Sequence, residues 1–424
     1  MKSKLVITVI GFLFLFPLNV MSQFSLEGEF RPRAEYRNGF GELIADTAEP
    51  GIGISTRARL NFGYKTEGYD LFVSLQDVMV WGENRQILPK DLDNSFSIFQ
   101  AWATIKLGEG FLVKLGRQTI VYDDQRIFGG LDWAQQGRNH DALIFKYKKK
   151  QFIFDLGLAF NQDYSNPTGF ISSGNTYTTK GYFSYKTMQY VYAKQSWKSF
   201  SGSILLLNNG FQEFAEDGVT QDGISNLQTI GAHLDYKKGK FGAAANLFLQ
   251  TGKRQGTIDV KGAYLASIDF SYKISSKIGL GFGTEIISGN DANDGETGAF
   301  FPLYGTNHKF NGFMDYFYVG NHANSIGLTD FHVSTNFKFA NKSSLLVKVL
   351  NFSGAQELTS GTKSLGTEVD LVYTKKFNGY ALKAGYSQMF ASDGMYELKG
   401  TTKDAAAETQ NWAWVMLIIK PKFL

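Results

Sequence analysis

Residues 27–37 alternate strictly between two kinds of side chain, and this alternation constrains the fold more than any other feature. The odd positions are all charged, whereas the even positions are all apolar, small or aromatic. A period of two residues is that of a β-strand with two different faces. Such a strand fits either the salt-bridged edge of a soluble sheet or the wall of a transmembrane barrel with a wet lumen. The rest of the chain must decide between these two structures.

The composition favours the barrel. Of the 424 residues, 15% are aromatic, with 37 Phe and 21 Tyr, and the chain has 46 Gly but only 7 Pro. Aromatic and glycine enrichment with little proline suits many twisted strands joined by tight turns, with aromatic girdles at the two membrane interfaces. The mean hydropathy is slightly negative, which is compatible with a barrel because lumen-facing residues cancel lipid-facing ones in any average.

The first residues predict a secretory signal peptide. Basic residues at positions 2 and 4 precede an apolar run to about Val20, and Val20-Met21-Ser22 offers small residues for cleavage. The run contains Pro17 and is shorter than the roughly 20 residues that a membrane helix needs. We therefore predict a signal peptide at 1–22 and one domain at 23–424. No later segment is apolar enough to span as a helix, so a membrane form of this chain must be a closed barrel.

Strand-like segments are joined alternately by short and long connections. Tight turns such as Gly108-Glu109-Gly110 and Lys148-Lys149-Lys150 contrast with longer polar segments such as 123–136. This asymmetry is typical of outer-membrane barrels, which have short periplasmic turns and long extracellular loops. Counting the segments gives about eighteen strands, and an even number places both termini on the periplasmic side. The sequence thus predicts an all-β, antiparallel transmembrane barrel of about 18 strands.

Alternation also assigns faces to individual strands. The Phe and Leu side chains at the even positions of 152–160 should meet lipid, and the glycines between 279 and 283 should line the lumen. Pro32 cannot donate a ladder hydrogen bond in a barrel that has no free edge, so we expect a bulge or a pairing gap there. Arg117 falls on the lipid side, which predicts either a bulge that turns it inward or a position beyond the lipid belt.

Basic side chains of the first strands should share one side of the lumen. Guanidinium groups bind carboxylates through two hydrogen bonds, and rings of arginine select anions in pores. The predicted pore-lining arginines of these strands are Arg31, Arg33, Arg37, Arg57 and Arg59, to which alternation adds Lys114 and Gln118. Acidic residues share the predicted lumen, so the alternative is an internal salt-bridge ladder that braces the wall and closes the pore. These acidic residues are Glu29, Glu35, Glu285, Glu368 and Asp370.

Several longer motifs are more distinctive than the alternation. They are Leu115-Gly116-Arg117-Gln118, Arg138-Asn139-His140-Asp141, the block that runs from Phe301 to Asp315, Gly366-Thr367-Glu368-Val369-Asp370 and Ile419-Lys420-Pro421-Lys422-Phe423. In these motifs the chain resembles the alginate-export outer-membrane barrels, particularly their relatives in Bacteroidetes, and the resemblance covers essentially the whole mature chain.

The resemblance implies a monomeric, eighteen-stranded barrel in the outer membrane of a Gram-negative bacterium. Its narrow, arginine-lined pore would pass an anionic uronate polymer outward, without a cofactor. The matching motifs add Arg117, Arg138 and His140 to the predicted pore-lining residues.

The longest segment without strand character, about 289–325, is where we expect a gate or plug. Its candidate gating residues are His308, Lys309 and Asp315. The alternative is that its aromatic residues merely fold the loop onto the barrel mouth. Residues 291–296 resemble a calcium loop but lack the distal Glu, so we predict a solvated acidic tip and no metal.

Three further aromatic residues allow two interpretations of their role. They are Trp102, Tyr122 and Trp133. Such rings can offer stacking surfaces for sugars, and the alternative is that they belong to an interfacial girdle or to loop packing.

Other classes of function find little support. The chain has no Cys, which excludes disulfides, thiolate nucleophiles and Cys-based zinc sites. It has neither a Gly-x-Ser-x-Gly nor a His-Glu-x-x-His motif, and neighbouring His140 and Asp141 should point to opposite faces of a strand. A formal net charge of +4, spread along the chain, gives no basic patch for nucleic acid. We therefore expect no enzyme and no nucleic-acid partner.

The sequence predicts an outer-membrane channel that passes anionic saccharides or small anions by diffusion through an arginine-bearing lumen. Two alternatives remain at this point: a general porin with little charge preference, and a structural or adhesion barrel whose lumen is closed by internal salt bridges.

Overall fold

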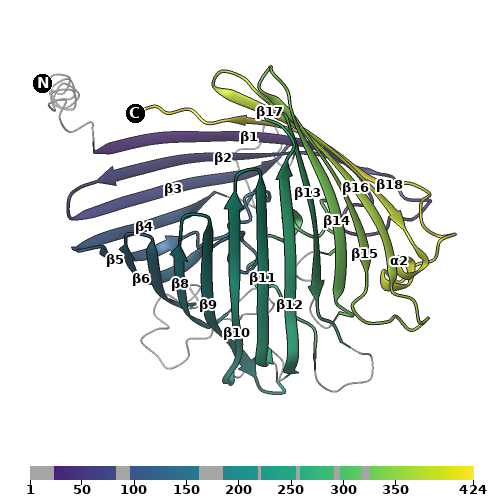
Figure 1. Cartoon of the computed structure of the whole chain (residues 1–424), viewed down its shortest axis with the longest axis horizontal. Helices are drawn as coiled ribbons and strands as arrows, with labels where there is room; N and C mark the ends of the chain where they lie inside the picture. The colour runs from purple at the N-terminus through teal and green to yellow at the C-terminus, as the bar shows by residue number, and fades with distance from the viewer. Residues whose placement is uncertain are drawn as a thin grey trace, which may run out of the picture.

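The structure is a computed structural model, and it describes residues 23–82, 96–161, 185–217, 221–254, 258–290, 297–317 and 325–424. The predicted signal peptide at 1–22 and the acidic segment 291–296 lie outside these ranges. The described residues form one antiparallel sheet of eighteen strands (Figure 1). Among them, no helix is long and apolar enough to cross a membrane.

The strands follow one another along the chain with one short helix near the end. They are β1 (Phe24–Asn38), β2 (Gly51–Lys65), β3 (Tyr69–Val80), β4 (Ser97–Gly108), β5 (Phe111–Gln118), β6 (His140–Lys149), β7 (Phe152–Phe160), β8 (Thr187–Ser196), β9 (Phe200–Phe214), β10 (Gln221–Lys238), β11 (Phe241–Arg254), β12 (Ile258–Lys273), β13 (Ile278–Ile287), β14 (Leu328–Lys338), β15 (Ser343–Ser353), β16 (Ser364–Lys376), β17 (Tyr380–Ala391) and β18 (Gln410–Ile419), with α2 (Asp393–Leu398) between the last two.

The sheet is closed on itself. Each strand pairs with its neighbours in the sequence. The first and last strands, β1 and β18, also pair with each other. The predicted all-β, 18-stranded antiparallel barrel is therefore confirmed, and the soluble edge strand is excluded, because a closed barrel has no edge.

The two faces of the wall differ as the alternation predicts. On β1, the Phe30 side chain is 44% exposed on the outside, whereas Arg31 is only 4% exposed. On β7, Leu158 and Phe160 are exposed, whereas Asp155 is buried. The outside of the barrel is thus apolar and aromatic, and the inside carries the charges.

The lumen-facing glycines make room for neighbouring side chains. A Cβ atom added to Gly283 would lie 2.5 Å from Asp269 Oδ1 and 2.9 Å from His332 Cε1. The imidazole of His332 pairs with Asp269 at 2.9 Å across this position. A larger residue at 283 would therefore break an ion pair on the inner wall.

Pro32 interrupts the contact between the first and last strands. Phe30 pairs with Ile419 and Arg33 pairs with Met416, whereas residues 31 and 32 have no partner on β18. On its other side Pro32 pairs with Thr56 in an unbroken register. The predicted pairing gap is confirmed.

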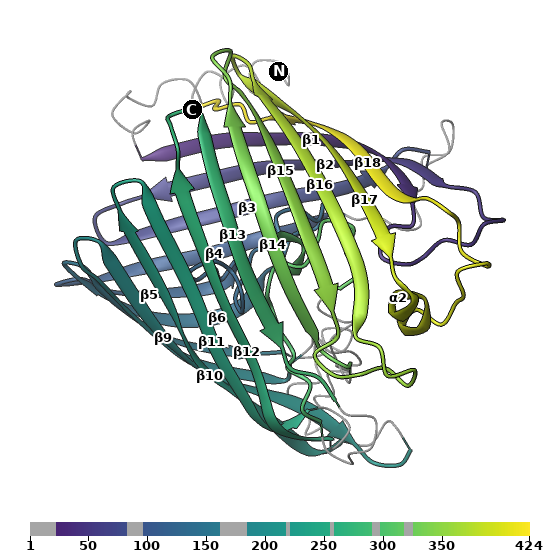
Figure 2. The ribbon, with the colours of Figure 1, turned by 45° about the vertical axis from the view of Figure 1, so that its right-hand side comes forward.

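Short and long connections lie at opposite ends of the barrel. The C-terminus returns to the start of β1, where the Leu26 N–H donates a hydrogen bond to Leu424 O at 3.4 Å. Figure 2 shows α2 at the other end, with the longer connections. By the asymmetry of outer-membrane barrels, the end with the short turns is periplasmic.

Two of the long connections fold into the lumen. We call residues 119–139 the first inner loop, and residues 288–327, described at 288–290, 297–317 and 325–327, the second inner loop. The first inner loop begins where β5 ends at Gln118 and the chain leaves the wall. The loops meet where the Gly129 N–H donates to Tyr304 O at 2.9 Å.

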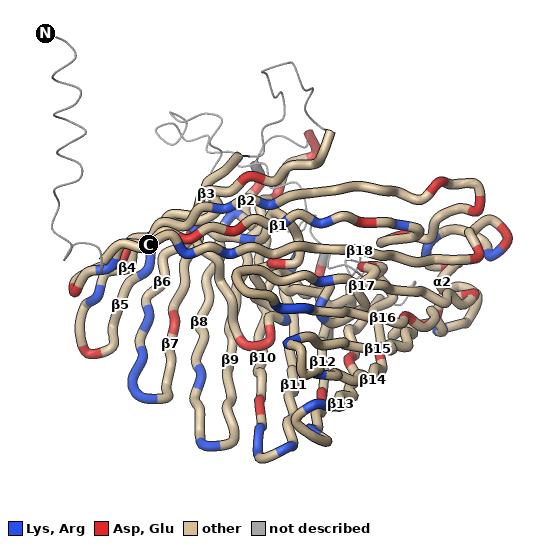
Figure 3. Tube along the Cα trace, turned by 90° about the horizontal axis from the view of Figure 1, so that it is seen from above, with Lys and Arg blue, Asp and Glu red and all other residues tan. Residues whose placement is uncertain are grey.

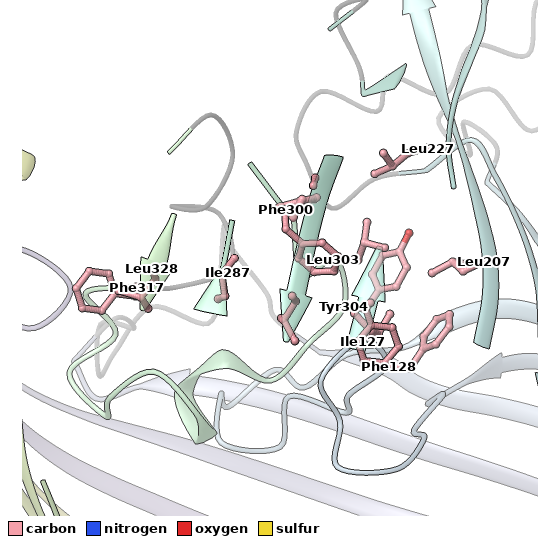
Figure 4. Packing of buried hydrophobic residues seen from close by; sticks show 14 of the residues in the cluster. Ile127, Phe128, Leu207, Leu227, Ile287, Phe300, Leu303, Tyr304, Phe317 and Leu328 are labelled. Carbon is pink, nitrogen blue, oxygen red and sulfur yellow. The ribbon is translucent and has the colours of Figure 1, made fainter. Parts of the chain in front are cut away.

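The two inner loops share a hydrophobic cluster with the wall. Phe128 and Tyr304 stack with ring centroids 5.4 Å apart. Figure 4 shows these rings beside Leu207 of β9 and Leu227 of β10. The lumen at this level is therefore filled by packed loops on one side of the barrel.

Candidate functional site: an arginine cluster beside the inner loops

The arginines of β1 and β2 hold the first inner loop against the wall. Arg57 pairs with Glu29 and, at 2.8 Å, with Asp132 Oδ1. Arg31 donates to Asp132 O at 2.7 Å and to Gln135 Oε1 at 2.9 Å. Both guanidinium groups are almost completely buried. Charge-assisted bonds to carbonyls and carboxylates account for a stable burial of these two cations.

Two further arginines, Arg33, which is buried, and Arg37, which is exposed, share one carboxylate. Arg33 Nε donates to Glu35 Oε2 at 2.9 Å, and Arg37 Nη2 donates to Glu35 Oε1 at 3.0 Å. Each also lies over an aromatic ring: Arg33 is 4.5 Å from the centroid of Trp133, and Arg37 is 4.4 Å from that of Phe40. These contacts fix the planes of both guanidinium groups.

Positive charge exceeds negative charge in this cluster. The fifth member, Arg59, donates to Gln76 Oε1 at 2.6 Å and lies 3.7 Å from the ring centroid of Phe99. The carboxylates within the cluster are Glu29, Glu35 and Asp132. Burial raises the pKa of Asp132, but the charge of Arg57 and its hydrogen bond outweigh this effect and hold that pKa below its usual range. Five cations thus face three anions.

The predicted gating residues connect the two inner loops to each other. His308 stacks on Trp133 with ring centroids 4.6 Å apart and planes 9° apart. Its Nδ1 is 3.0 Å from Asp315 Oδ1. Lys309 Nζ donates to Asp124 O at 2.8 Å. All three residues therefore lie in the lumen and not in a surface loop.

Sequence reasoning missed Arg126, which anchors the first inner loop to the far wall. Arg126 Nε donates to Glu285 Oε2 at 2.7 Å, and both residues are buried. Asn311 Nδ2 donates to Glu285 Oε1 at 2.8 Å. Arg126 lies outside the strands, so alternation gives no signal for it.

The acidic pair on β16 is buried, and one of its two carboxyl groups holds the second inner loop. The Met314 N–H donates to Glu368 Oε1 at 3.0 Å, and Ser387 Oγ donates to Asp370 Oδ1 at 2.5 Å. Both carboxyl groups are completely buried. Glu368 therefore holds the loop, Asp370 bonds to the neighbouring strand β17, and both acids lie apart from the arginine cluster.

The remaining predicted pore-lining residues have mixed positions. Lys114 faces inward, with Nζ 4.0 Å from the ring centroid of Trp102, and Gln118 is buried on the same face. His140 also points inward, but it is sealed against the Tyr185 hydroxyl at 3.0 Å. Arg138 Nη1 donates to Gly305 O at 3.3 Å, which joins the two inner loops.

The assignment of Arg117 to the pore was wrong. Arg117 lies on the outer face, where Nε and Nη2 each donate to Asp141 at 2.9 Å. The two residues are direct partners in an unshifted register between β5 and β6. A carboxylate opposite the arginine removes the need for a bulge, and Asp141 points away from His140 as predicted.

Two of the three aromatic rings with a predicted sugar-stacking alternative contact neighbouring side chains instead. Tyr122 donates to Asp155 Oδ2 at 2.6 Å and stacks on Tyr192 at 4.0 Å. Trp133 is covered by His308 and Trp414. Loop packing is thus the role that the contacts give to these two rings.

Cavities lie on both sides of the inner loops. One of about 510 Å³ is lined by Arg33, Arg37, Phe40, Trp133 and Asp315 toward the long-loop end. Another of about 560 Å³ lies on the inner wall toward the short-turn end. Within the described residues, no cluster of His, Asp or Glu is arranged to hold a metal ion.

The family model for alginate export matches residues 22–406 of this chain. No curated protein matches it. Similar solved structures include Acinetobacter baumannii OccAB4, with 14% identity, a TM-score of 0.62 and coverage of 95% of this chain and 98% of that one. The Pseudomonas aeruginosa outer membrane protein OpdK has 11% identity, a TM-score of 0.58 and coverage of 94% and 99%. OpdK with vanillate has 10% identity, a TM-score of 0.56 and the same coverage.

Proposed function

Because the chain belongs to the alginate export family, we propose that it passes anionic saccharides, uronate polymers or oligomers, or small anions through the arginine-bearing part of its lumen. The protein is an outer-membrane β-barrel of a Gram-negative bacterium with a porin-like fold.

The excess of cations beside a cavity is the observation that carries the proposal. The cavity at the long-loop end is lined by Arg33 and Arg37, and their shared carboxylate, Glu35, neutralises only one of the two. Guanidinium groups select planar carboxylates by forked hydrogen bonds, and they do so without a cofactor. The structure of OpdK with vanillate, a carboxylate, makes an anion a reasonable cargo for this fold.

Planar-bilayer recordings test the proposal. The purified barrel should give an anion-biased reversal potential in a salt gradient, and an oligouronate should block the current. Reversing Arg31, Arg33 and Arg57 together to Glu should invert the selectivity. Since all three of these residues are buried, the variant Arg33→Gln with Arg37→Gln provides a milder version, which should reduce the anion bias without reversing it.

A matched control is available on the outer wall. Arg117→Gln removes a cation of the same type that does not face the lumen, so the reversal potential should not change. An unchanged reversal potential in both lumen variants would refute the role of the arginines. A weakly selective current in the native protein would indicate a general porin.

One observation favours a second candidate, a structural or adhesion barrel. The buried guanidinium groups of Arg31 and Arg57 are bound to Glu29, Asp132 and loop carbonyls, as in a ladder that closes the pore. Absence of current under all conditions, from a correctly folded barrel, would support this alternative.

A further inference from the structure

Lysine and arginine are segregated along the barrel. Six short turns join consecutive strands between β6 and β17. With the strand ends beside them, they span 148–151, 197–199, 237–240, 273–277, 338–342 and 375–379. They contain thirteen Lys and no Arg, Asp or Glu. Figure 3 shows this as blue at the turns that join β6 to β7, β8 to β9 and β10 to β11. The arginines of the cluster lie further inside, on β1 and β2.

Six of these lysines lie on the inner faces of their strands. Lys237 continues the inward face of His233 and Asp235, and Lys273 continues that of Asp269. The other four lysines also occupy positions that alternate in step with buried or lumen-facing residues of their strands, so they lie on the inner face as well. We call this set the lysine collar: Lys148, Lys237, Lys273, Lys277, Lys338 and Lys376.

The collar differs from the arginine cluster in being open. All six lysine side chains are exposed. Among the described residues, Lys237, Lys273 and Lys338 form no ion pair, whereas every arginine of the cluster has a carboxylate within 4 Å. These ammonium groups are therefore available to a ligand.

Small residues widen the mouth at the collar. Gly242, Ala244, Ser271, Gly281 and Ser334 line the cavity of about 560 Å³, together with two collar lysines. A second cavity of about 510 Å³ beside it contains Lys277 and Lys338. The collar thus surrounds open space on this side of the barrel.

The opposite end has the opposite charge. The connections at 39–50, 354–363 and 392–409 contain eight acidic residues and three lysines. An anion approaching the short-turn end meets an attractive field, and one approaching the other end meets a repulsive rim. Clefts lined by one sign of charge raise association rates by about 10-fold to 10³-fold.

We propose that the lysine collar captures an anionic polymer chain at the periplasmic mouth and feeds it to the arginine cluster. This inference rests on the proposed function and adds to it a separate binding site, formed by lysines at the short-turn mouth. Ammonium groups are compact, strongly hydrated point charges on flexible stems, which attract carboxylates without the fixed fork of arginine. Their spread over strands from β6 to β16 favours a ligand that bears several carboxylates at once, because successive contacts then become intramolecular.

Binding of a fluorescent oligouronate of about eight sugars to the detergent-solubilised barrel tests the collar directly. The collar variant combines Lys237→Gln, Lys273→Gln and Lys338→Gln. Its association rate at low salt should fall by about 10-fold, within the range of electrostatic steering, and the difference from native protein should disappear at high salt. Binding of a single uronate sugar should change much less.

The matched control removes three lysines of the same turns that lie on the outer face: Lys149→Gln, Lys238→Gln and Lys375→Gln. Its net charge equals that of the collar variant, so an equal loss in both variants would show general attraction by net charge and overturn the collar. An unchanged rate in the collar variant would also overturn it. Because this assay measures binding and not current, it can succeed or fail independently of anion conduction, which the recordings on the arginine variants address.

Discussion

Arg126 and Glu285, which are 159 positions apart in the sequence, form a buried ion pair that joins the first inner loop to β13. Arg57 and Asp132 anchor the same loop to β2. The loop is therefore attached at two places on the wall by charged groups, and its conformation depends on both.

Removing Arg126 should destabilise the barrel strongly. Arg126→Ala leaves Glu285 buried without its cation, which costs about 3–5 kcal/mol of unfolding free energy in comparable pairs. Urea unfolding of the detergent-solubilised protein measures this loss. Arg117→Ala removes an exposed pair of the same type and should cost less than about 1 kcal/mol. Similar losses in the two variants would contradict the buried anchor.

Removing the indole of Trp133 should loosen the contact between the inner loops. Trp133→Ala removes the stack on His308 and the ring beneath Arg33, so the loops should separate more readily. We expect larger or noisier single-channel currents than in the native protein. Trp197→Ala, which alters an exposed ring at a short turn, is the control; currents equal to native in both variants would argue against a seal at Trp133.

Neutralising Asp132 should increase the preference for anions. Asp132→Asn removes one of three carboxylates from the arginine cluster, while the carbonyls of 132–134 still hold Arg31. The reversal potential in a salt gradient should shift further toward that of the anion. Asp141→Asn removes a carboxylate from the outer wall and should leave it unchanged. A shift toward cations in the first variant would be inconsistent with the proposed selectivity.

Gly385 connects the wall to the loops through Trp414. A Cβ atom at 385 would overlap the Trp414 ring, and that ring packs on Trp133 with centroids 4.8 Å apart. Gly385→Val should therefore displace Trp414, lower the unfolding free energy by about 1–3 kcal/mol, as overpacking does, and change the current as Trp133→Ala does. Gly379→Val, at an open turn position with φ +84°, tests whether strain alone has this effect; it should lower stability without altering the current.

The wall of the barrel was predictable because the face on which a side chain lies depends only on its position within the strand. A strand places successive side chains on opposite faces, so Phe30 and Arg31 are assigned by position alone. The pairing gap at Pro32 follows because proline has no backbone N–H to donate to the neighbouring strand. The outward position of Arg117 was also implied by alternation; its assignment to the pore came from the family motif that contains it, and the outward position is stabilised by Asp141 on the neighbouring strand.

The interior was less predictable because its contacts join distant parts of the chain. Residues 119–139 fold into the lumen, and Arg126 pairs with Glu285, but neither feature produces an alternating pattern in the sequence. The burial of Arg31 and Arg57 beneath a loop also depends on that descent. Alternation shows that a side chain faces inward, but it does not show whether water or another loop lies there.

The interrupted ladder at Pro32 has a consequence for assembly. The other strand contacts join segments that are adjacent in the chain, whereas β1 and β18 come from its two ends, and bringing distant segments together carries the greatest entropic cost. We therefore expect the pairing of β1 with β18 to form after the other strand pairings of the wall. Because Pro32 lies in β1, the strand pairing that closes the barrel is also the one that lacks some of its backbone contacts.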